Sequence, residues 1–183
     1  MTGSNHLPRG KFLLQFSSEA ESLLVAINNK PEFSSFVETI VSKPDMIGTL
    51  LEIIRTDKGS IKFYCDKVIR KISETRPSLV YPYFHEIAQL IDSSNNFIKW
   101  GALLTISNLI AVDHEKRFNA IYDQYFDLIN SDSMITAANV AGNAWKFIQA
   151  MPDKEDDITT RLLRVPKNTY LYKGEPSPEC KNI

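Results

Sequence analysis

The sequence has few of the features from which an enzymatic activity is usually inferred. Its two cysteines, Cys65 and Cys180, lie far apart and form no metal-binding or redox motif, so we expect two reduced thiols. It contains no glycine-rich phosphate loop, no HExxH motif and no GxSxG motif. The three histidines, His6, His85 and His114, are widely separated, and we expect each to be a solvent-exposed structural residue. The sequence therefore predicts no catalytic residues, no metal site and no cofactor.

An excess of charge of one sign is also missing. The formal net charge is −1 at pH 7, whereas an extended nucleic-acid footprint usually needs a strong basic excess. Nucleic acid is therefore not an expected partner. Hydrophobic residues make up 43% of the chain and charged residues 23%, which is typical of an ordinary folded protein with one core or one array of small units.

Long hydrophobic runs are scarce as well. The run FLLQF that follows Lys11 is too short for a signal-peptide core and is soon followed by Glu19. The stretch poorest in charge, NNFIKWGALLTISNLIAVD at 95–113, is shorter than the ~20 apolar residues that cross a bilayer, and it contains Thr105 and Ser107. We therefore expect a cytoplasmic protein without a membrane segment, in which 95–113 forms a buried helix.

What the sequence does contain is an internal repeat. In 95–113, Ile98, Ala102, Ile106 and Leu109 recur at helical spacing and define one face of a helix. The same slots are occupied, with one polar exception, in segments about 37 residues earlier and later: Ile61, Cys65, Ile69 and Ile72, and then Thr136, Val140, Ala144 and Phe147. Such a period predicts stacked helix pairs.

Proline punctuates these pairs. Pro44, Pro77 and Pro152 fall between the two halves of units, where proline ends one helix and fits the first turn of the next. We predict a leading helix near 18–29 and pairs at 33–56, 60–92, 96–130 and 134–165, with no strand-like alternation. The expected fold is all-α, with a flexible N-terminal tail at 1–17, a repeat domain at 18–165 and a C-terminal tail at 166–183.

The segment LIDSSNNFIKWGALLTISNL, 90–109, resembles the HEAT repeat, a helix-pair module of α-solenoids. It has Asp92 in the turn, then the aliphatic–basic pair Ile98-Lys99 and a first helix with small residues such as Ala102. The resemblance implies about four HEAT-like pairs in a right-handed superhelix, with an inter-repeat ladder of acidic and basic residues. HEAT proteins include transport receptors, scaffolds, lyase-like pigment-attachment proteins and a few DNA-repair enzymes, so the resemblance is specific for architecture only.

Two surfaces are candidates for partner binding. If the second helices line a concave groove, their tyrosines and phenylalanines either face that groove or pack in the core. If they pack in the core, the groove residues are those of the opposite ridge, Glu86, Gln89, Asn119, Asp123 and Asp127. The other surface is a basic segment that is either a solvated outer face or a patch for an acidic or phosphorylated partner: Lys62, Lys67, Arg70 and Lys71.

We therefore expect a non-catalytic protein-interaction or scaffold module that binds a protein or peptide. One alternative is a HEAT-like nucleic-acid-binding or DNA-base-repair enzyme, for which Trp100, Trp145, Asp113 and Asp123 supply the residue types; another is a lyase-like ligand-binding HEAT protein. Asp113 is better explained as the N-cap of the next helix.

The C-terminal tail ends in PECKNI, which looks like the opening turn of a further first helix. Either a following repeat has been lost, or the tail caps the fourth unit. The exposed end of a helical array must be covered, so we expect the C-terminal repeat face to self-associate or to bind a partner.

Overall fold

The computed structural model describes residues 17–165, 168–172 and 175–176. Over these residues the chain is almost entirely helical, which confirms the predicted all-α fold. The helices are α1 (Ser18–Asn28), α2 (Phe33–Ser42), α3 (Met46–Thr56), α4 (Ile61–Thr75), α5 (Pro77–Val80), α6 (Phe84–Ala88), α7 (Asn96–Leu109), α8 (Tyr122–Asp127), α9 (Met134–Ala150) and α10 (Glu155–Leu162). Short 3-10 helices continue or precede several of them: η1 (Tyr81–Tyr83), η2 (Gln89–Asp92), η3 (Ile110–Val112), η4 (Arg117–Ile121), η5 (Leu128–Asn130) and η6 (Pro152–Lys154).

Helix starts follow from local sequence chemistry. The side chain of Asn95 accepts hydrogen bonds from the N–H groups of Phe97 and Ile98 in the first turn of α7. The side chain of Ser133 accepts one from the N–H of Thr136 in the first turn of α9. Pro77 and Pro152 lie in the first turn of α5 and η6, where their missing N–H has no partner to lose. The predicted proline breaks are therefore confirmed at both positions.

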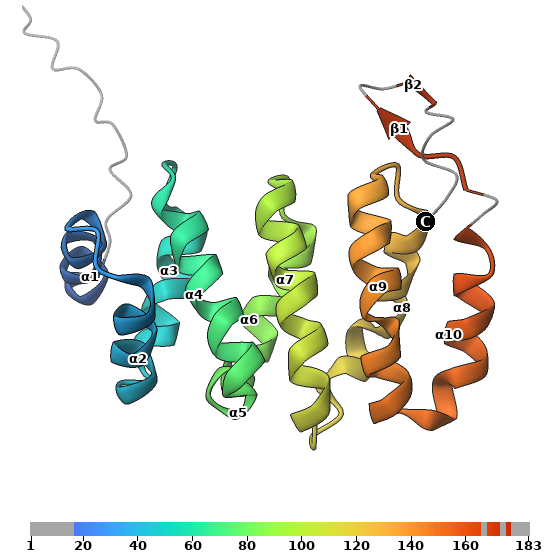
Figure 1. Cartoon of the computed structure of the whole chain (residues 1–183), viewed down its shortest axis with the longest axis horizontal. Helices are drawn as coiled ribbons and strands as arrows, with labels where there is room; N and C mark the ends of the chain where they lie inside the picture. The colour runs from blue at the N-terminus through green and yellow to red at the C-terminus, as the bar shows by residue number, and fades with distance from the viewer. Residues whose placement is uncertain (1–16, 166–167, 173–174, 177–183) are drawn as a thin grey trace, which may run out of the picture.

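The helices follow one another along the long axis of the molecule (Figure 1). The long helices α4, α7 and α9 lie side by side on the face turned to the viewer, and α6 and α8 lie behind them. Helix α4 packs against α7, and α7 packs against α9. This arrangement places the C-terminal ends of α4, α7 and α9 next to one another, where the candidate site lies.

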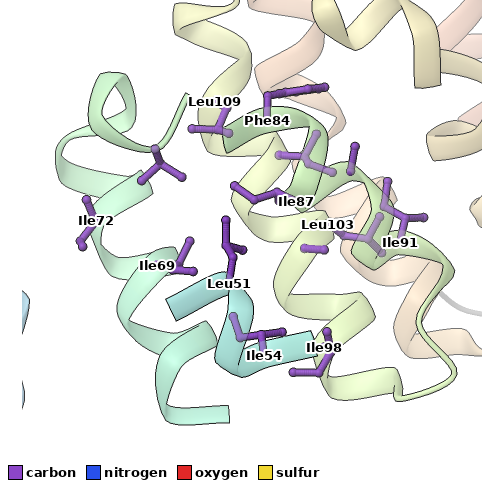
Figure 2. Packing of buried hydrophobic residues seen from close by; sticks show 14 of the residues in the cluster. Leu51, Ile54, Ile69, Ile72, Phe84, Ile87, Ile91, Ile98, Leu103 and Leu109 are labelled. Carbon is purple, nitrogen blue, oxygen red and sulfur yellow. The ribbon is translucent and has the colours of Figure 1, made fainter. Parts of the chain in front are cut away.

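The predicted helix faces form the core. Side chains of α3, α4, α6 and α7 point toward one another in Figure 2. Nearly every residue of the three recurring faces is buried, and only Ile61 stays partly exposed. The polar exception, Thr136, is buried too, and its hydroxyl accepts a hydrogen bond of 2.9 Å from the indole nitrogen of Trp100 on α7. This bond satisfies a hydroxyl that would otherwise cost free energy to bury.

The second half of the third unit has one buried face and one solvent-exposed face. Phe118, Tyr125 and Ile129 are buried, whereas Asp123 and Asp127 are exposed. This second half is not one continuous α-helix, because α8 lies between the 3-10 helices η4 and η5.

Asp113 stabilises the start of the next helix, as the sequence predicts, although the N-cap position of η4 itself is occupied by Lys116. Its carboxylate accepts hydrogen bonds from the backbone N–H groups of Arg117 (2.8 Å) and Phe118 (3.0 Å), the first two residues of η4. The turn before η4 contains Lys116 with φ 54°, a left-handed conformation that is uncommon outside glycine.

The C-terminal tail, in the part that is described, packs against the junction between the third and fourth units. Tyr170 is buried, and its hydroxyl donates to the carbonyl of Ile129 (3.2 Å), while the N–H of Leu171 donates to the carbonyl of Asp132 (2.8 Å). Beyond it, the strands β1 (Leu171–Tyr172) and β2 (Glu175–Pro176) form a short antiparallel pair. The absence of strand-like alternation in the sequence is compatible with this pair, because two residues per strand are too few to show alternation.

Two predicted segments lie outside the described residues: the N-terminal tail through position 16, which includes His6, and the PECKNI segment, which includes Cys180. Within the described ranges, none of the helices has the length and apolar character needed to cross a membrane.

Candidate functional site

The predicted acidic ridge is joined to the last helix. The guanidinium group of Arg161 on α10 binds Asp123 at 2.5 Å and Asp127 at 2.8 Å, and it binds Asp157 of its own helix at 2.8 Å. The Arg161 side chain is only 21% exposed, whereas the two ridge carboxylates are mostly exposed. The structure thus brings Asp123 and Asp127 together, but around a cation that already neutralises part of their charge.

Tyr122 completes this cluster. Its hydroxyl donates a hydrogen bond of 2.7 Å to Asp157, and its ring lies beneath the guanidinium of Arg161 and the ammonium of Lys154. The pKa of the Asp157 carboxyl is lowered, mainly by this hydrogen bond and also by Arg161. The cluster explains how α8 and α10 are held together.

The other ridge residues are dispersed. The Gln89 amide lies 3.0 Å from the ring of His85, one helical turn away, and Glu86 is half-buried on α6. Asn119 is exposed on η4, near Asp123. The predicted ridge therefore spans α6, η2, η4 and α8, and only its α8 part forms a close cluster.

The four predicted basic residues, Lys62, Lys67, Arg70 and Lys71, are spread over about half of the circumference of α4. Lys71 pairs with Glu74 at 3.2 Å, and the ammonium of Lys67 lies 4.5 Å from the ring centroid of Phe33. Lys62 donates instead to the backbone carbonyl of Asp57 (3.3 Å). At about 100° per residue, positions 62 and 71 point to opposite sides of α4. The arrangement agrees with the solvated-face interpretation of this segment.

The aromatic side chains of the second helices mostly pack in the core. Phe84, Tyr125 and Phe126 are buried. Tyr81 is half-buried, and its hydroxyl donates a hydrogen bond of 2.6 Å to Asp113. Core packing therefore holds for the three buried side chains, whereas Tyr81, Tyr83 and Tyr122 stay partly exposed.

The residues considered for base-repair chemistry do not converge on one site. Trp100 is half-buried and bonded to Thr136, while Asp113 caps η4 and Asp123 binds Arg161. Trp145, on α9, is exposed.

A hollow of about 560 Å³ lies at the C-terminal ends of α4, α7 and α9, and sequence reasoning did not find it. We name it the Trp145 hollow and define it by six of its lining residues: Ser73, Asn108, Asp113, Trp145, Lys146 and Gln149. Its volume lies within the range of small-molecule and peptide side-chain sites.

A chain of hydrogen bonds across three helices forms the polar part of the Trp145 hollow. The ammonium of Lys146 on α9 donates to the side-chain oxygen of Asn108 on α7 at 2.7 Å and to the Ser107 hydroxyl at 3.3 Å. The Asn108 amide in turn donates to the hydroxyl of Ser73 on α4 at 2.9 Å. These bonds fix the ammonium at one place in the hollow.

Lys146 carries a charge that no acidic group of the described chain balances directly. Among the described residues, no carboxylate lies within 4.0 Å of its Nζ. Partial burial lowers the pKa of Lys146, and the more distant carboxylate of Glu74 offsets that effect. Glu74 itself is paired with Lys71.

Trp145 supplies the apolar wall of the hollow. It is 55% exposed, which is unusual for a large aromatic residue in a helix with neighbours. It belongs to an uncharged exposed stripe of α9 with Ala138, Gly142 and Gln149. The charge-poor sequence of 135–151 predicts neighbours on both sides of this helix, but along this stripe the described residues leave α9 uncovered.

A second hollow of about 570 Å³ adjoins the first, because Ile110, Asp113 and Ala150 line both. We name it the Tyr122 hollow; its lining includes Lys116, Asn119, Tyr122, Asp123, Asp153 and Lys154. It therefore contains two of the five predicted ridge residues. The two hollows meet at the Asp113 cap.

One sequence signal could have indicated the Trp145 hollow. Lys146 is the one charged residue within 135–151, directly after a tryptophan. Its contacts with Ser107 and Asn108 follow only from the packing of α9 on α7, which a periodicity does not give.

In the described part of the chain, no group of three or more histidine, cysteine, aspartate or glutamate side chains is placed to hold a metal ion. No family model matches the sequence, and neither a curated protein nor a solved structure matches it.

Proposed function

We propose that the protein is a non-catalytic binding module, and that a segment of a partner protein binds in the Trp145 hollow. The observation that carries this proposal is the exposed indole of Trp145 beside a polar floor held by three helices. Exposed aromatic residues in a hollow are typical of interaction sites, where they contribute much of the binding free energy.

As part of the proposal, the scaffold is a solenoid of about four HEAT-like helix pairs. Its support is the burial of equivalent positions, such as Cys65, Ala102 and Val140, on three successive long helices. Helices α4, α7 and α9 also pack consecutively, as stacked repeats would. In such an array the partner would bind across neighbouring units rather than within one.

The absence of catalysis is also proposed, and two observations support it. The Cys65 thiol is fully buried and its pKa is raised to about 12 by burial, so it is a poor nucleophile. The Asp113 carboxylate accepts three hydrogen bonds, from the Tyr81 hydroxyl and from two backbone N–H groups, which leaves it poorly suited as a general base.

Affinity capture with the immobilised full chain tests the proposal. We expect a defined partner to be retained by the wild-type protein and lost on Trp145→Ala, because the substitution removes the apolar wall. Val25→Ala is the matched control, since Val25 on α1 is 63% exposed and lines neither hollow. A set of captured proteins that is the same for all three would refute the proposal, provided circular dichroism shows equal folding.

A further inference from the structure

We infer that the Trp145 hollow binds an acidic peptide segment, with a carboxylate side chain of the segment on Lys146 and a neighbouring apolar side chain against Trp145. This inference rests on the proposed function and specifies the chemistry of the partner.

The way in which the charged groups of the hollow are paired favours an anion at Lys146. Two carboxylates contribute to its lining, but Glu74 is paired with Lys71, and Asp113 is occupied by Tyr81 and the N–H groups of η4. Lys146 donates only to neutral oxygens. An ammonium that is partly removed from water and has no counter-ion gains most from an incoming carboxylate.

The geometry favours a side chain rather than a free ion. An ammonium group has three N–H donors, and two of those of Lys146 are directed to Asn108 and Ser107. The third is left for a ligand at a fixed position. Because Trp145 precedes Lys146 on the same helix and its ring centroid lies 5.8 Å from the ammonium, a ligand there meets an apolar wall as well as a charge.

The adjoining Tyr122 hollow extends the site. It contributes Lys116 and Lys154, neither of which has a carboxylate within 4.0 Å in the described chain. Of its three aspartates, Asp113 and Asp123 are already bound, to the η4 cap and to Arg161, which leaves one aspartate, Asp153, beside the two lysines. A segment with a second acidic residue can therefore continue past Asp113 from the first hollow into the second.

A peptide fits these groups better than a nucleic acid does. Phosphate recognition usually uses arginine forks, several backbone N–H groups or a basic surface, and the Trp145 hollow offers a single lysine with two lining carboxylates. A singly charged carboxylate needs no more than Lys146 provides.

Selection of phage-displayed random dodecapeptides on the immobilised full chain tests the inference. We expect the selected peptides to share a glutamate or aspartate close to an aliphatic or aromatic residue. Binding of one such synthetic peptide, measured by fluorescence anisotropy, should weaken about tenfold or more on Lys146→Met, since a charge-assisted hydrogen bond is lost. Lys99→Met is the control, because Lys99 is also half-buried but lines neither hollow.

A change in the peptide gives the same test without altering the protein. Replacing its acidic residue by the amide should weaken binding to the wild-type chain and leave binding to Lys146→Met unchanged. Neutral or basic selected peptides, or equal binding by Lys146→Met, overturn the inference; if binding still requires Trp145, the proposed function stands. Selected peptides whose binding does not depend on Trp145, or a selection that yields no peptides, overturn both the inference and the proposed function. Displacement by equimolar inorganic phosphate or single-stranded DNA would indicate a phosphate site and also overturn the inference.

Discussion

The carboxyl group of Asp66 on α4 occupies the space in which a side chain at position 101 of α7 would begin. Gly101 therefore sets how closely the two helices approach. Asp66 is only 9% exposed, so this contact places an ionisable group within the interface between α4 and α7. Two of the predictions below follow from this pair.

Gly101→Ala should destabilise the protein, because the added methyl group overlaps the Asp66 carboxyl group. Overpacking of this kind costs about 1–3 kcal/mol, more than the gain of about 1 kcal/mol from removing a glycine within a helix. The matched control is Gly142→Ala on α9, where nothing lies within 4 Å of the new Cβ and a stabilisation of roughly 0.5–1 kcal/mol is expected. Urea denaturation measures both.

Adding Asp66→Ala to Gly101→Ala should recover part of the lost stability, since the carboxyl group no longer fills the space. If Gly101→Ala were as stable as Gly142→Ala, the close approach of α4 and α7 would be disproved.

Stability should also depend on pH through Asp66. Burial raises the pKa of its carboxyl from 3.8 to about 6, although Arg70 opposes the shift. Because the folded-state pKa is the higher one, the contribution of Asp66 to stability is complete below pH 3.8 and is lost as the pH rises through 6. The loss is about 3 kcal/mol.

Asp66→Asn removes the charge and keeps the shape. It should be more stable than the wild type by about 3 kcal/mol at pH 8 and nearly equal to it at pH 4. Thermal or urea unfolding of both proteins across this range gives the difference, in which the other titrating groups largely cancel. A difference that does not change with pH would contradict the raised pKa.

Arg161→Ala should loosen the contact between α8 and α10. The substitution removes the guanidinium that binds three carboxylates, which then repel one another. The free energy of unfolding should fall by only about 1–2 kcal/mol, because the carboxylates are largely solvated. The loss should be smaller in 1 M salt than at low ionic strength. Since Tyr122 and Arg161 hold the pKa of Asp157 below 3.8, its contribution is present at neutral pH and is lost as the pH falls below that value. Urea denaturation at both salt concentrations measures these changes.

Arg164→Ala is the matched control for Arg161, because Arg164 is exposed on the same end of the molecule and forms no ion pair within the described residues. Equal stability of the two variants would show that the cluster contributes nothing.

Cys65 should resist alkylation in the folded protein. Its thiol is buried, and its pKa is about 12, so neither access nor thiolate is available at neutral pH. Mass spectrometry of peptides after a pulse of iodoacetamide should find position 65 unmodified in buffer and fully modified in urea. Rapid modification in buffer would show that α4 is less well packed than described.

The sequence predicts the helices well because helix formation depends on local patterns. The buried face of α7, from Ile98 to Leu109, repeats every three or four residues, and polar turns with Asn95 or Ser133 mark the helix starts. The burial of Thr136 is also implied by its place in the pattern, although its hydrogen bond to Trp100 is not.

The parts that the sequence does not predict depend on how helices rotate against each other. Because Asp66 is charged, the sequence pattern places it on the solvent-exposed face of α4. In the structure it instead faces Gly101 of α7. The neutralisation of Asp123 by Arg161 joins residues of adjacent helix pairs. The Trp145 hollow likewise forms where the ends of three helices meet, so no single segment of the sequence predicts it.

The described helices make their main contacts with near neighbours along the chain, as α4 does with α7 and α7 with α9. When such a molecule is stretched, only the contacts between neighbouring helices resist the force. Pulled by its two ends, it should lengthen in separate low-force steps as one helix pair after another detaches, each releasing on the order of 10 nm of chain. The end helices should detach first, so a partner seated across α4, α7 and α9 would bind the three together and raise the force at which they separate.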